Sequence, residues 1–299
     1  MINSGRVTVN GKPATLGTRL QGSDKVVLDG TTEVPWAQYV EKQTAAPYPE
    51  GLATNNGFVY IKYFKNAGVT TTTGRDPNGI LNTGDFKDVK LITAGSDKKK
   101  TEEVSVHVDR LLPVGRLDNQ STGLLLLTSD PRLPSWLLGA NTGCTKVCTV
   151  FYLSIFCTDS NVFHAQVYEV FLDRTPKAED LAKWQGGVSL TTASSTGKAQ
   201  RVQPTLPCKV RILMAPSDNV LPHAAPDVVQ QHAAGKGCWV QFQLKEGRNR
   251  QIRRMVHALG YKVRALHRAS FCGVEGSGLK PGQWAYLTQE ELLLLRRRK

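Results

Sequence analysis

Residues 114 to 130 read V-G-R-L-D-N-Q-S-T-G-L-L-L-L-T-S-D and carry the strongest chemical signal in the chain. Arg116 and Asp118 are separated by one residue, so an extended backbone directs both side chains to the same side. Leu124 to Leu127 follow as an uncharged run, which is short enough for a buried strand or a helical turn. From these residues alone, a structural Asp–Arg pair in a turn and a charged reactive group beside an apolar element are both open interpretations.

Size and composition restrict the class of protein. The chain has 299 residues, enough for one large domain or two smaller ones with a substantial core. Its formal net charge of +13 predicts a polyanionic partner, either nucleic acid or an anionic membrane surface. The most apolar stretch, residues 147–156, is about half the length of a membrane-spanning helix, so we expect no membrane span and favour nucleic acid. The six cysteines form no repeated C-x-x-C pairs, which argues against zinc and predicts reduced thiols in an intracellular compartment.

The first 50 residues read as a small β-rich unit followed by a linker. Val7 and Val9 alternate with polar residues, and the Asn10-Gly11 dipeptide that follows is a strong hairpin signal. Residues 26–28 form a second predicted strand, and from residue 31 to about residue 56 scattered prolines predict a linker with one helical turn at residues 36–41.

Residues 51–299 contain signals for both strands and helices. Strands are predicted at residues 58–65, 104–108, 164–170 and 239–244, and a polar loop at residues 84–101. A helix ending near Gly260 carries one apolar stripe, and a final helix at residues 288–298 begins with a capping box. Residues 215–237, rich in Pro, Ala and His, interrupt the pattern and read as a surface excursion.

Four strings resemble known families. The stretch at 114–130 closely resembles the G-R-L-D-x-x-[ST]-x-G-L-L-[LF]-L-T-[NS]-[DN] motif of the RsuA-like family of ribosomal RNA pseudouridine synthases. Residues 246–255 (E-G-R-N-R-Q-I-R-R-M) resemble that family's N-R-Q-[IV]-[RK]-R-M motif, and with residues 185–188 (Q-G-G-V) they look most like its large-subunit members. Residues 5–12 (G-R-V-T-V-N-G-K) resemble the second half of an S4 RNA-binding domain, whose two preceding helices would be missing here.

The resemblance implies a fold and an organisation. We expect an α+β catalytic domain at residues 51–299, with a mixed, largely antiparallel sheet, helices on its faces and the site in a central cleft. A truncated S4-like module and linker would occupy residues 1–50. Relative to the family, residues 139–163 are additional and would be either an insertion loop or an unspliced segment.

The resemblance also implies a site. Asp118 would be the catalytic nucleophile or base, Tyr168 would pack on the uracil, Arg253 would pair with the carboxylate, and Leu266 would lie under the base. Gln166 stands where the family pattern has a lysine. Candidate substrate contacts are Arg116, Arg248, Asn249, Arg250, Gln251, Arg254 and Arg268.

The expected reaction is the isomerisation of a uridine in ribosomal RNA to pseudouridine, which breaks an N-glycosidic bond and forms a carbon–carbon bond. This chemistry requires a carboxylate, a surface for a flipped-out base and positive charge for phosphates, but neither a cofactor nor a metal. We expect a monomer inside the cell, with the cytoplasm, the mitochondrion and the chloroplast all open. The main alternative is a catalytically degenerate RNA-binding factor for ribosome assembly. A methyltransferase is disfavoured, because no Gly-rich nucleotide loop follows a strand.

Overall fold

The chain divides into two compact units, residues 1–50 and 51–299. In the computed structural model, the described residues are 4–14, 23–34, 58–74, 76–94, 101–105, 110–138, 165–192, 201–218 and 220–296. The predicted helical turn at 36–41 and the insertion at 139–163 lie outside these ranges.

The first unit contains a four-stranded antiparallel sheet in the order β2-β1-β3-β4. Its strands are β1 (Val7–Val9), β2 (Lys12–Pro13), β3 (Val26–Leu28) and β4 (Thr32–Val34). Asn10 and Gly11 have φ values of 51° and 76°, the left-handed conformation that a two-residue hairpin turn requires, so the predicted hairpin is confirmed. β4 lies in the segment predicted as linker, because pairing with β3 imposes an extended conformation on a sequence with weak alternation of its own.

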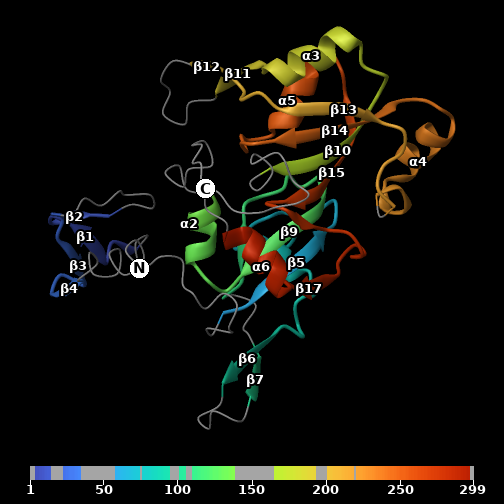
Figure 1. Cartoon of the computed structure of the whole chain (residues 1–299). Helices are drawn as coiled ribbons and strands as arrows, with labels where there is room; N and C mark the ends of the chain where they lie inside the picture. Colours follow the sequence, from blue (N-terminus) through green and yellow to red (C-terminus); the bar gives the residue numbers. More distant parts are fainter. Residues whose placement is uncertain are drawn as a thin grey trace, which may run out of the picture. The chain divides into compact units, whose positions relative to one another are not determined.

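The second unit is built on a nine-stranded sheet within the described residues. Its main path has the order β13-β14-β10-β15-β9-β5-β17 (Figure 1). In addition, β8 pairs with β9 and β16 pairs with β15. Its strands are β5 (Tyr60–Lys65), β8 (Leu112–Val114), β9 (Thr122–Thr128), β10 (Gln166–Leu172), β13 (Lys209–Leu213), β14 (Cys238–Leu244), β15 (Val263–Phe271), β16 (Val274–Glu275) and β17 (Trp284–Tyr286). All pairs are antiparallel except β9 with β15, which is parallel. The prediction of a mixed, largely antiparallel sheet is confirmed.

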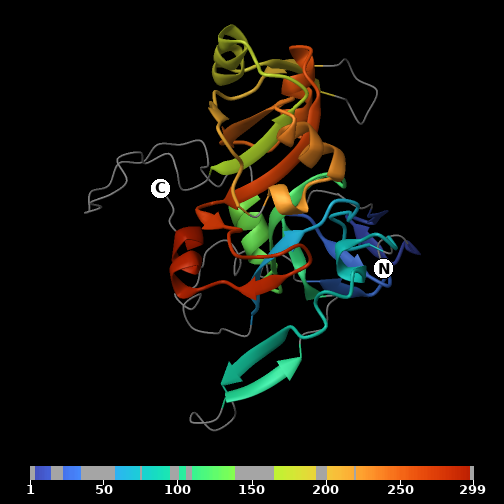
Figure 2. The ribbon, with the colours of Figure 1, turned by 90° about the vertical axis from the view of Figure 1, so that its right-hand side faces the viewer.

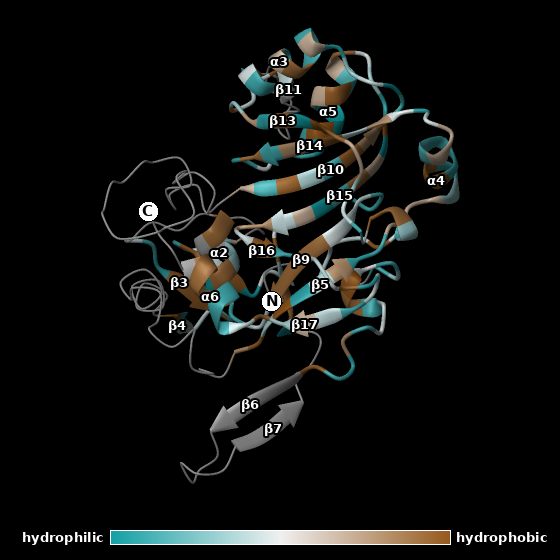
Figure 3. Cartoon of the chain, turned by 45° about the vertical axis from the view of Figure 1, so that its right-hand side comes forward, coloured by the Kyte–Doolittle hydropathy of each residue, from teal (hydrophilic) through white to brown (hydrophobic). Residues whose placement is uncertain are grey.

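The central strand β9 settles the two interpretations of the leucine run. Leu124 to Leu127 are 0–1% exposed and form a strand between β5 and β15 rather than a helical turn. In Figure 3 this strand is brown, the hydrophobic colour, for most of its length. Because the sheet is covered on both sides here, successive leucines are buried although their side chains alternate between faces.

Helices cover both faces of the sheet. On one face, α3 (Ala178–Gly186) and α5 (Gln251–Ala258) bury Trp184 and Met255 against Phe242 of β14. On the other face, Val228 of α4 (Pro226–Ala233) packs with Phe171 of β10 and Trp239 of β14. Successive side chains of a strand point to opposite faces, so one strand can serve both layers. The predicted α+β architecture with helices on its faces is confirmed. In Figure 1, α3 and α5 are drawn at the top of this unit and α4 at its right-hand side.

The segment 215–237 has more regular structure than expected. It forms a short 3-10 helix, η5 (Leu221–His223), and then α4, which begins with Pro226 at a position where proline is favoured. Val220 and Val228 are 4% and 1% exposed, and they pack on the back of the sheet. The hydroxyl and amide of Ser217 donate to the buried carboxylate of Glu169, at 2.5 and 2.8 Å, which fastens the segment to β10.

Smaller elements complete the unit. They are η3 (Ile80–Asn82), β6 (Lys90–Ala94), β7 (Thr101–Ser105), α2 (Arg132–Leu138), β11 (Ser189–Thr192), β12 (Arg201–Pro204) and α6 (Gln289–Arg296). β6 and β7 pair as a separate two-stranded ribbon (Figure 2), so the loop predicted at residues 84–101 contains a strand. The capping box is confirmed: the amide of Thr288 donates to the carboxylate of Glu291, and the amide of Glu291 donates to the hydroxyl of Thr288.

Candidate active site

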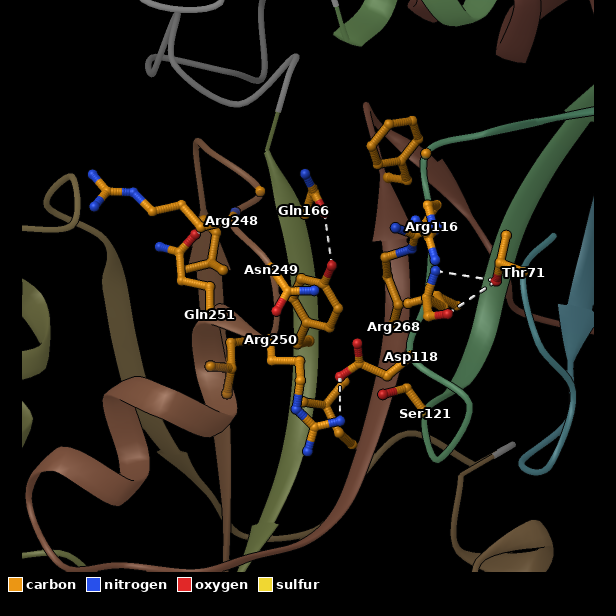
Figure 4. A pocket seen from close by; sticks show the side chains of 18 of the residues that line it. Thr71, Arg116, Asp118, Ser121, Gln166, Arg248, Asn249, Arg250, Gln251 and Arg268 are labelled. Carbon is orange, nitrogen blue, oxygen red and sulfur yellow. Dashed lines mark hydrogen bonds and ion pairs between the residues drawn. The ribbon is translucent and has the colours of Figure 1, made fainter. Parts of the chain in front are cut away.

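The Asp118 motif forms a loop that borders a cleft of about 720 Å³. The loop connects β8, which ends at Val114, to β9, which begins at Thr122. Arg116 and Asp118 both line the cleft (Figure 4). Across the cleft lie the loop at residues 245–250, the first turn of α5, and the strands β10 and β15.

Thr71 holds the backbone immediately before Asp118. Its buried hydroxyl accepts a hydrogen bond from the amide of Leu117 at 3.3 Å and donates one to the carbonyl of the same residue at 3.0 Å (Figure 4). On the other side, the amide of Ser121 donates to the carbonyl of Asp118 at 3.0 Å. Hydrogen bonds to main-chain groups on both sides therefore fix the backbone around Asp118. The carboxylate of Asp118 makes none of these bonds.

Lys65 lies behind the same loop and was not among the predicted site residues. It is fully buried, and its ammonium donates to the carbonyls of Asn66, Ser121 and Asn119 at 2.7, 2.9 and 3.3 Å. Burial lowers the pKa of Lys65 to about 8, although the negative charge of Asp118 acts in the opposite direction. The available signal is a lysine at the end of a largely apolar strand, but such a residue is usually solvated.

Gly123 allows β9 to approach β15 closely. Its φ is 104°, and a Cβ atom placed there would lie 2.4 Å from the carbonyl oxygen of Arg268 and 2.9 Å from the ring of His267. Only glycine combines this backbone conformation with this contact. The glycine of the motif therefore joins the Asp118 loop to the strand that carries Leu266 and Arg268.

Two arginines from the opposite side of the cleft face Asp118. The Nε atom of Arg253 lies 3.4 Å from Oδ2 of Asp118, and Nη1 of Arg250 lies 3.8 Å from the same oxygen. The side chains of Asp118, Arg253 and Arg250 are 24%, 13% and 49% exposed. The Asp–Arg pair thus forms across the cleft, whereas Arg116, in the same turn as Asp118, is exposed.

Arg253 has several polar neighbours, but its guanidinium is not fully hydrogen-bonded within the described residues. Its Nη2 atom lies 3.4 Å from both the carbonyl of Gln120 and the hydroxyl of Ser121. Its buried Nε makes the ion pair with Asp118 but has no hydrogen bond of good geometry within the described residues. Burial lowers the pKa of Arg253 from its usual value, and the charge of Asp118 counteracts this shift.

Tyr168 and Leu266 occupy the floor of the cleft. They are 8% and 6% exposed and lie on adjacent strands, β10 and β15. The hydroxyl of Tyr168 donates to Oε1 of Gln166 at 2.7 Å, so the residue that replaces the family's lysine is the partner of the tyrosine (Figure 4). An aromatic ring and an aliphatic side chain side by side provide a surface on which a flat base can lie.

The loop at residues 246–251 is stabilised by its own polar residues. Gln251 is buried, accepts from the amide of Arg248 at 2.9 Å, and donates to Glu246 at 3.0 Å. The guanidinium of Arg248 bonds to Glu246 and to the carbonyls of Gln203 and Pro204 in β12. These contacts hold the loop against the β11–β12 hairpin.

The predicted substrate contacts therefore fall into separate groups. Arg250 and Asn249 are exposed on the cleft, while Arg248 and Gln251 line it with their polar groups engaged within the protein. Arg254 does not line the cleft, and its guanidinium donates to the carbonyl of Thr191 in β11.

Arg268, a candidate substrate contact like Arg248 and Arg250, is 1% exposed and lies in the cleft wall. Its Nε donates to the carbonyl of Leu124 at 2.7 Å, and its guanidinium carbon lies 4.9 Å from the centre of the Phe271 ring. The alternating pattern of β15 predicts which face Arg268 occupies, but only the sheet order shows that this face is covered.

Among the described residues, no group of three or more histidine, cysteine or acidic side chains is placed to hold a metal ion. Cys208, Cys238 and Cys272 are all buried. Within the same part of the chain, no helix combines the length and the apolar character that crossing a membrane requires.

Comparison with known proteins shows which family the sequence matches. The profile of a family described as RNA pseudouridylate synthase matches residues 59–258. The chain is 26% identical to ribosomal large subunit pseudouridine synthase B of Bacillus subtilis (strain 168), over 99% of this chain and 87% of that protein. It is also 26% identical to the dual-specificity RNA pseudouridine synthase RluF of Escherichia coli (strain K12), over 98% of this chain and 70% of that protein.

A structural comparison agrees at the level of the fold. A solved structure described as a pseudouridylate synthase superposes with a TM-score of 0.53 at 21% identity, covering 98% of this chain and 90% of that one. These findings confirm the resemblance that the two motifs around Asp118 and Arg253 carry. Since the family match spans more than half of the sequence, the chain belongs to the RNA pseudouridylate synthase family.

Proposed function

We propose that this chain converts a specific uridine of ribosomal RNA to pseudouridine, and that Asp118 is the residue that acts on the ribose. The observation that carries the proposal is the carboxylate of Asp118 in the cleft, with guanidinium groups at 3.4 and 3.8 Å and a backbone held independently of its side chain. The ribosomal substrate is supported by the relatives, among them one named for the large ribosomal subunit.

The reaction is an isomerisation, so its atoms must balance within one nucleotide. The C1′–N1 bond breaks and its electron pair leaves with the uracil. Asp118 either bonds to C1′ as a nucleophile or takes the proton from C2′ as a base. The uracil then turns, C5 bonds to C1′, the C5 proton is lost and N1 gains a proton. Asp118 is regenerated because its bond to C1′ breaks in the nucleophilic route, or because it returns the proton to C2′ in the base route. Both routes need an ionised carboxylate next to the ribose.

The surrounding residues support this assignment. Arg253 places a cation 3.4 Å from the carboxylate of Asp118 and limits its orientation through this ion pair. Tyr168 and Leu266 provide the surface for a uracil that has left its stack in the RNA. Arg250, Arg116 and Asn249 lie on the cleft with exposure suited to phosphate or sugar contacts.

The remaining assignments rest on sequence. We infer that residues 1–50 act as an S4-like RNA-binding module, that the protein is a monomer, and that it works inside the cell, where its RNA is found. The net charge of +13 supports RNA binding by the whole chain.

The test is Asp118→Asn, which preserves size but removes the negative charge. Tritium release from ribosomal RNA labelled at C5 of uridine should fall to background, while RNA affinity changes less than about threefold. Carbodiimide mapping of the wild-type reaction identifies the modified uridine. Wild-type turnover by a folded Asp118→Asn protein would overturn the assignment. A wild-type chain that binds ribosomal RNA but releases no tritium would support the binding-only alternative.

A further inference from the structure

The cleft contains a charged group that the proposed function does not yet use. Arg268 is 1% exposed, and one of its guanidinium nitrogens, Nη2, is buried without a hydrogen-bond partner among the described residues. Leaving a buried donor unpaired costs about 1–3 kcal/mol, and more for a charged group. Such a group in a cleft wall indicates a ligand atom that accepts from it.

The position of Arg268 relates it to the place of the base. Arg268 lies two residues after Leu266 on β15, so both side chains are on the same face of the strand. It also lies directly opposite Tyr168 in the pairing with β10. Two residues along a strand span roughly 6.5–7 Å. For a uracil that lies on Leu266 and Tyr168, we therefore expect the guanidinium of Arg268 beside the edge of the ring. There it would lie close to the plane that contains the carbonyl oxygens of the uracil.

The charges around the floor of the cleft are unbalanced. Lys65 and Arg268 are 0% and 1% exposed, the side chain of Arg253 is 13% exposed, and the carboxylate of Asp118 faces them. The positive charge of Arg268 contributes to the lowered pKa of Lys65, after burial itself and against the effect of Asp118. A site with this excess of buried positive charge stabilises a ligand that becomes negative during the reaction.

Burial favours the base over a phosphate as that ligand. A phosphate is charged before and after the reaction and would have to lose its hydration to reach a group that is 1% exposed. A phosphate that binds the exposed guanidinium of Arg250 loses less of its hydration, so its desolvation costs less free energy. A uracil, in contrast, enters the cleft uncharged and becomes negative only when the C1′–N1 bond breaks, with the charge shared by N1 and the carbonyl oxygens.

We propose that Arg268 is a catalytic residue whose Nη2 donates a hydrogen bond to a carbonyl oxygen of the target uracil and stabilises the negative charge that the base acquires. The inference rests on the proposed function. The C1′–N1 electron pair moves onto the base, and the guanidinium keeps all its protons, so no further reactant is needed.

The experiment compares Arg268→Lys and Arg268→Gln with the wild type on two RNAs. One RNA carries the mapped target uridine, and the other carries an abasic nucleotide at that position. We expect single-turnover isomerisation to fall about 10²–10³-fold, in line with the loss of one preorganised donor. Affinity for the uridine RNA should fall, while affinity for the abasic RNA stays at the wild-type value, which also shows that the variant is folded.

A matched control is Arg250→Gln, which should weaken the binding of both RNAs by the same factor. If Arg268 contacted a phosphate, its variants would behave like this control, and the proposal would be overturned. A wild-type single-turnover rate in Arg268→Lys would overturn it as well. If Asp118→Asn is inactive while Arg268→Lys retains full activity, only this inference fails; if Asp118→Asn is active, the proposed function fails.

A measurement on the unaltered chain removes any dependence on the folding of variants. With 4-thiouridine at the target position, irradiation should cross-link the base to residues 263–271, the strand β15. A cross-link pattern that excludes this strand would contradict the placement of the base edge at Arg268.

Discussion

The two walls of the cleft hold their charges in different ways. On the Asp118 wall (residues 114–123 with Lys65), the lysine is 0% exposed and donates to backbone carbonyls only. On the arginine wall (residues 246–254), the side chain of Arg250 is 49% exposed and lies 3.8 Å from its acidic partner. A buried charge must bond to fixed groups because water cannot solvate it, whereas an exposed charge can exchange its partners.

This difference indicates a division of labour. The Asp118 wall fixes the position of the reacting carboxylate through Thr71, Lys65 and close packing at Gly123. The arginine wall supplies positive charge, part of it accessible to RNA, and Arg253 connects the two walls through its ion pair. Changes to the first wall should therefore act on stability and chemistry, and changes to the exposed part of the second should act on RNA affinity.

The largest effect is expected from Gly123→Ala. The added methyl group would lie 2.4 Å from the carbonyl oxygen of Arg268 at a φ of 104°, so strain and overlap together should lower the free energy of unfolding by about 3 kcal/mol or more. Urea denaturation measures the change. The control is Gly278→Ala, which has a φ of 81° but no atom within 4 Å of the added carbon, and should cost about 1 kcal/mol. Equal losses for the two variants would show that close packing at Gly123 is unimportant.

Arg253→Gln should have the next largest effect, because the carboxylate loses the partner that connects the two walls. We expect the single-turnover rate to fall about a hundredfold, as for a misplaced catalytic group, with little loss of stability. The matched control is Arg211→Gln, on the outer strand β13 and not among the residues that line the cleft. A rate equal to that of the control would contradict a role for Arg253 in holding Asp118.

The buried lysine predicts a pH dependence. Its pKa is lowered from 10.5 to about 8 in the folded protein, so between these pH values the unfolded chain binds more protons than the native one. The contribution of this group to stability therefore increases as pH rises from about 8 to 10.5 and is lost as pH falls through 8. Relative to Lys65→Met, the wild type should gain about 1 kcal/mol per pH unit in this range, by urea denaturation. A constant difference would show that Lys65 is not desolvated.

Arg250→Gln should have the smallest effect. An exposed pair at 3.8 Å contributes less than about 1 kcal/mol, so stability and single-turnover rate at saturating RNA should change little. RNA affinity should fall, and the slope of log affinity against log salt should decrease by about one unit if one phosphate contact is lost. An unchanged slope with a strongly reduced rate would instead place Arg250 with Arg253 in the chemistry.

Much of the local structure could be predicted from the sequence. Alternation identified the strands around residues 60–65 and 239–244, and the apolar stripe and the capping box identified the helices that became α5 and α6. These features depend on contacts between residues a few positions apart, which any short stretch reveals. β4 and β6 were not predicted, because their extended conformation comes from pairing with a neighbouring strand rather than from a pattern of their own.

Sequence by itself identified the family and the carboxylate of the motif, Asp118. It also identified Tyr168 and Leu266 as the residues proposed to contact the base. The family resemblance already implied Arg253 as the partner of Asp118. Only the tertiary structure decided that Lys65 is buried behind the loop and that Arg268 is enclosed in the cleft wall. The reason is that burial and charge pairing depend on the order of strands in the sheet. β9 lies between β5 and β15, although the latter follows it by more than a hundred residues. Patterns along the chain specify which face a side chain occupies, and the strands that cover that face decide whether its charge meets water, the backbone or a substrate.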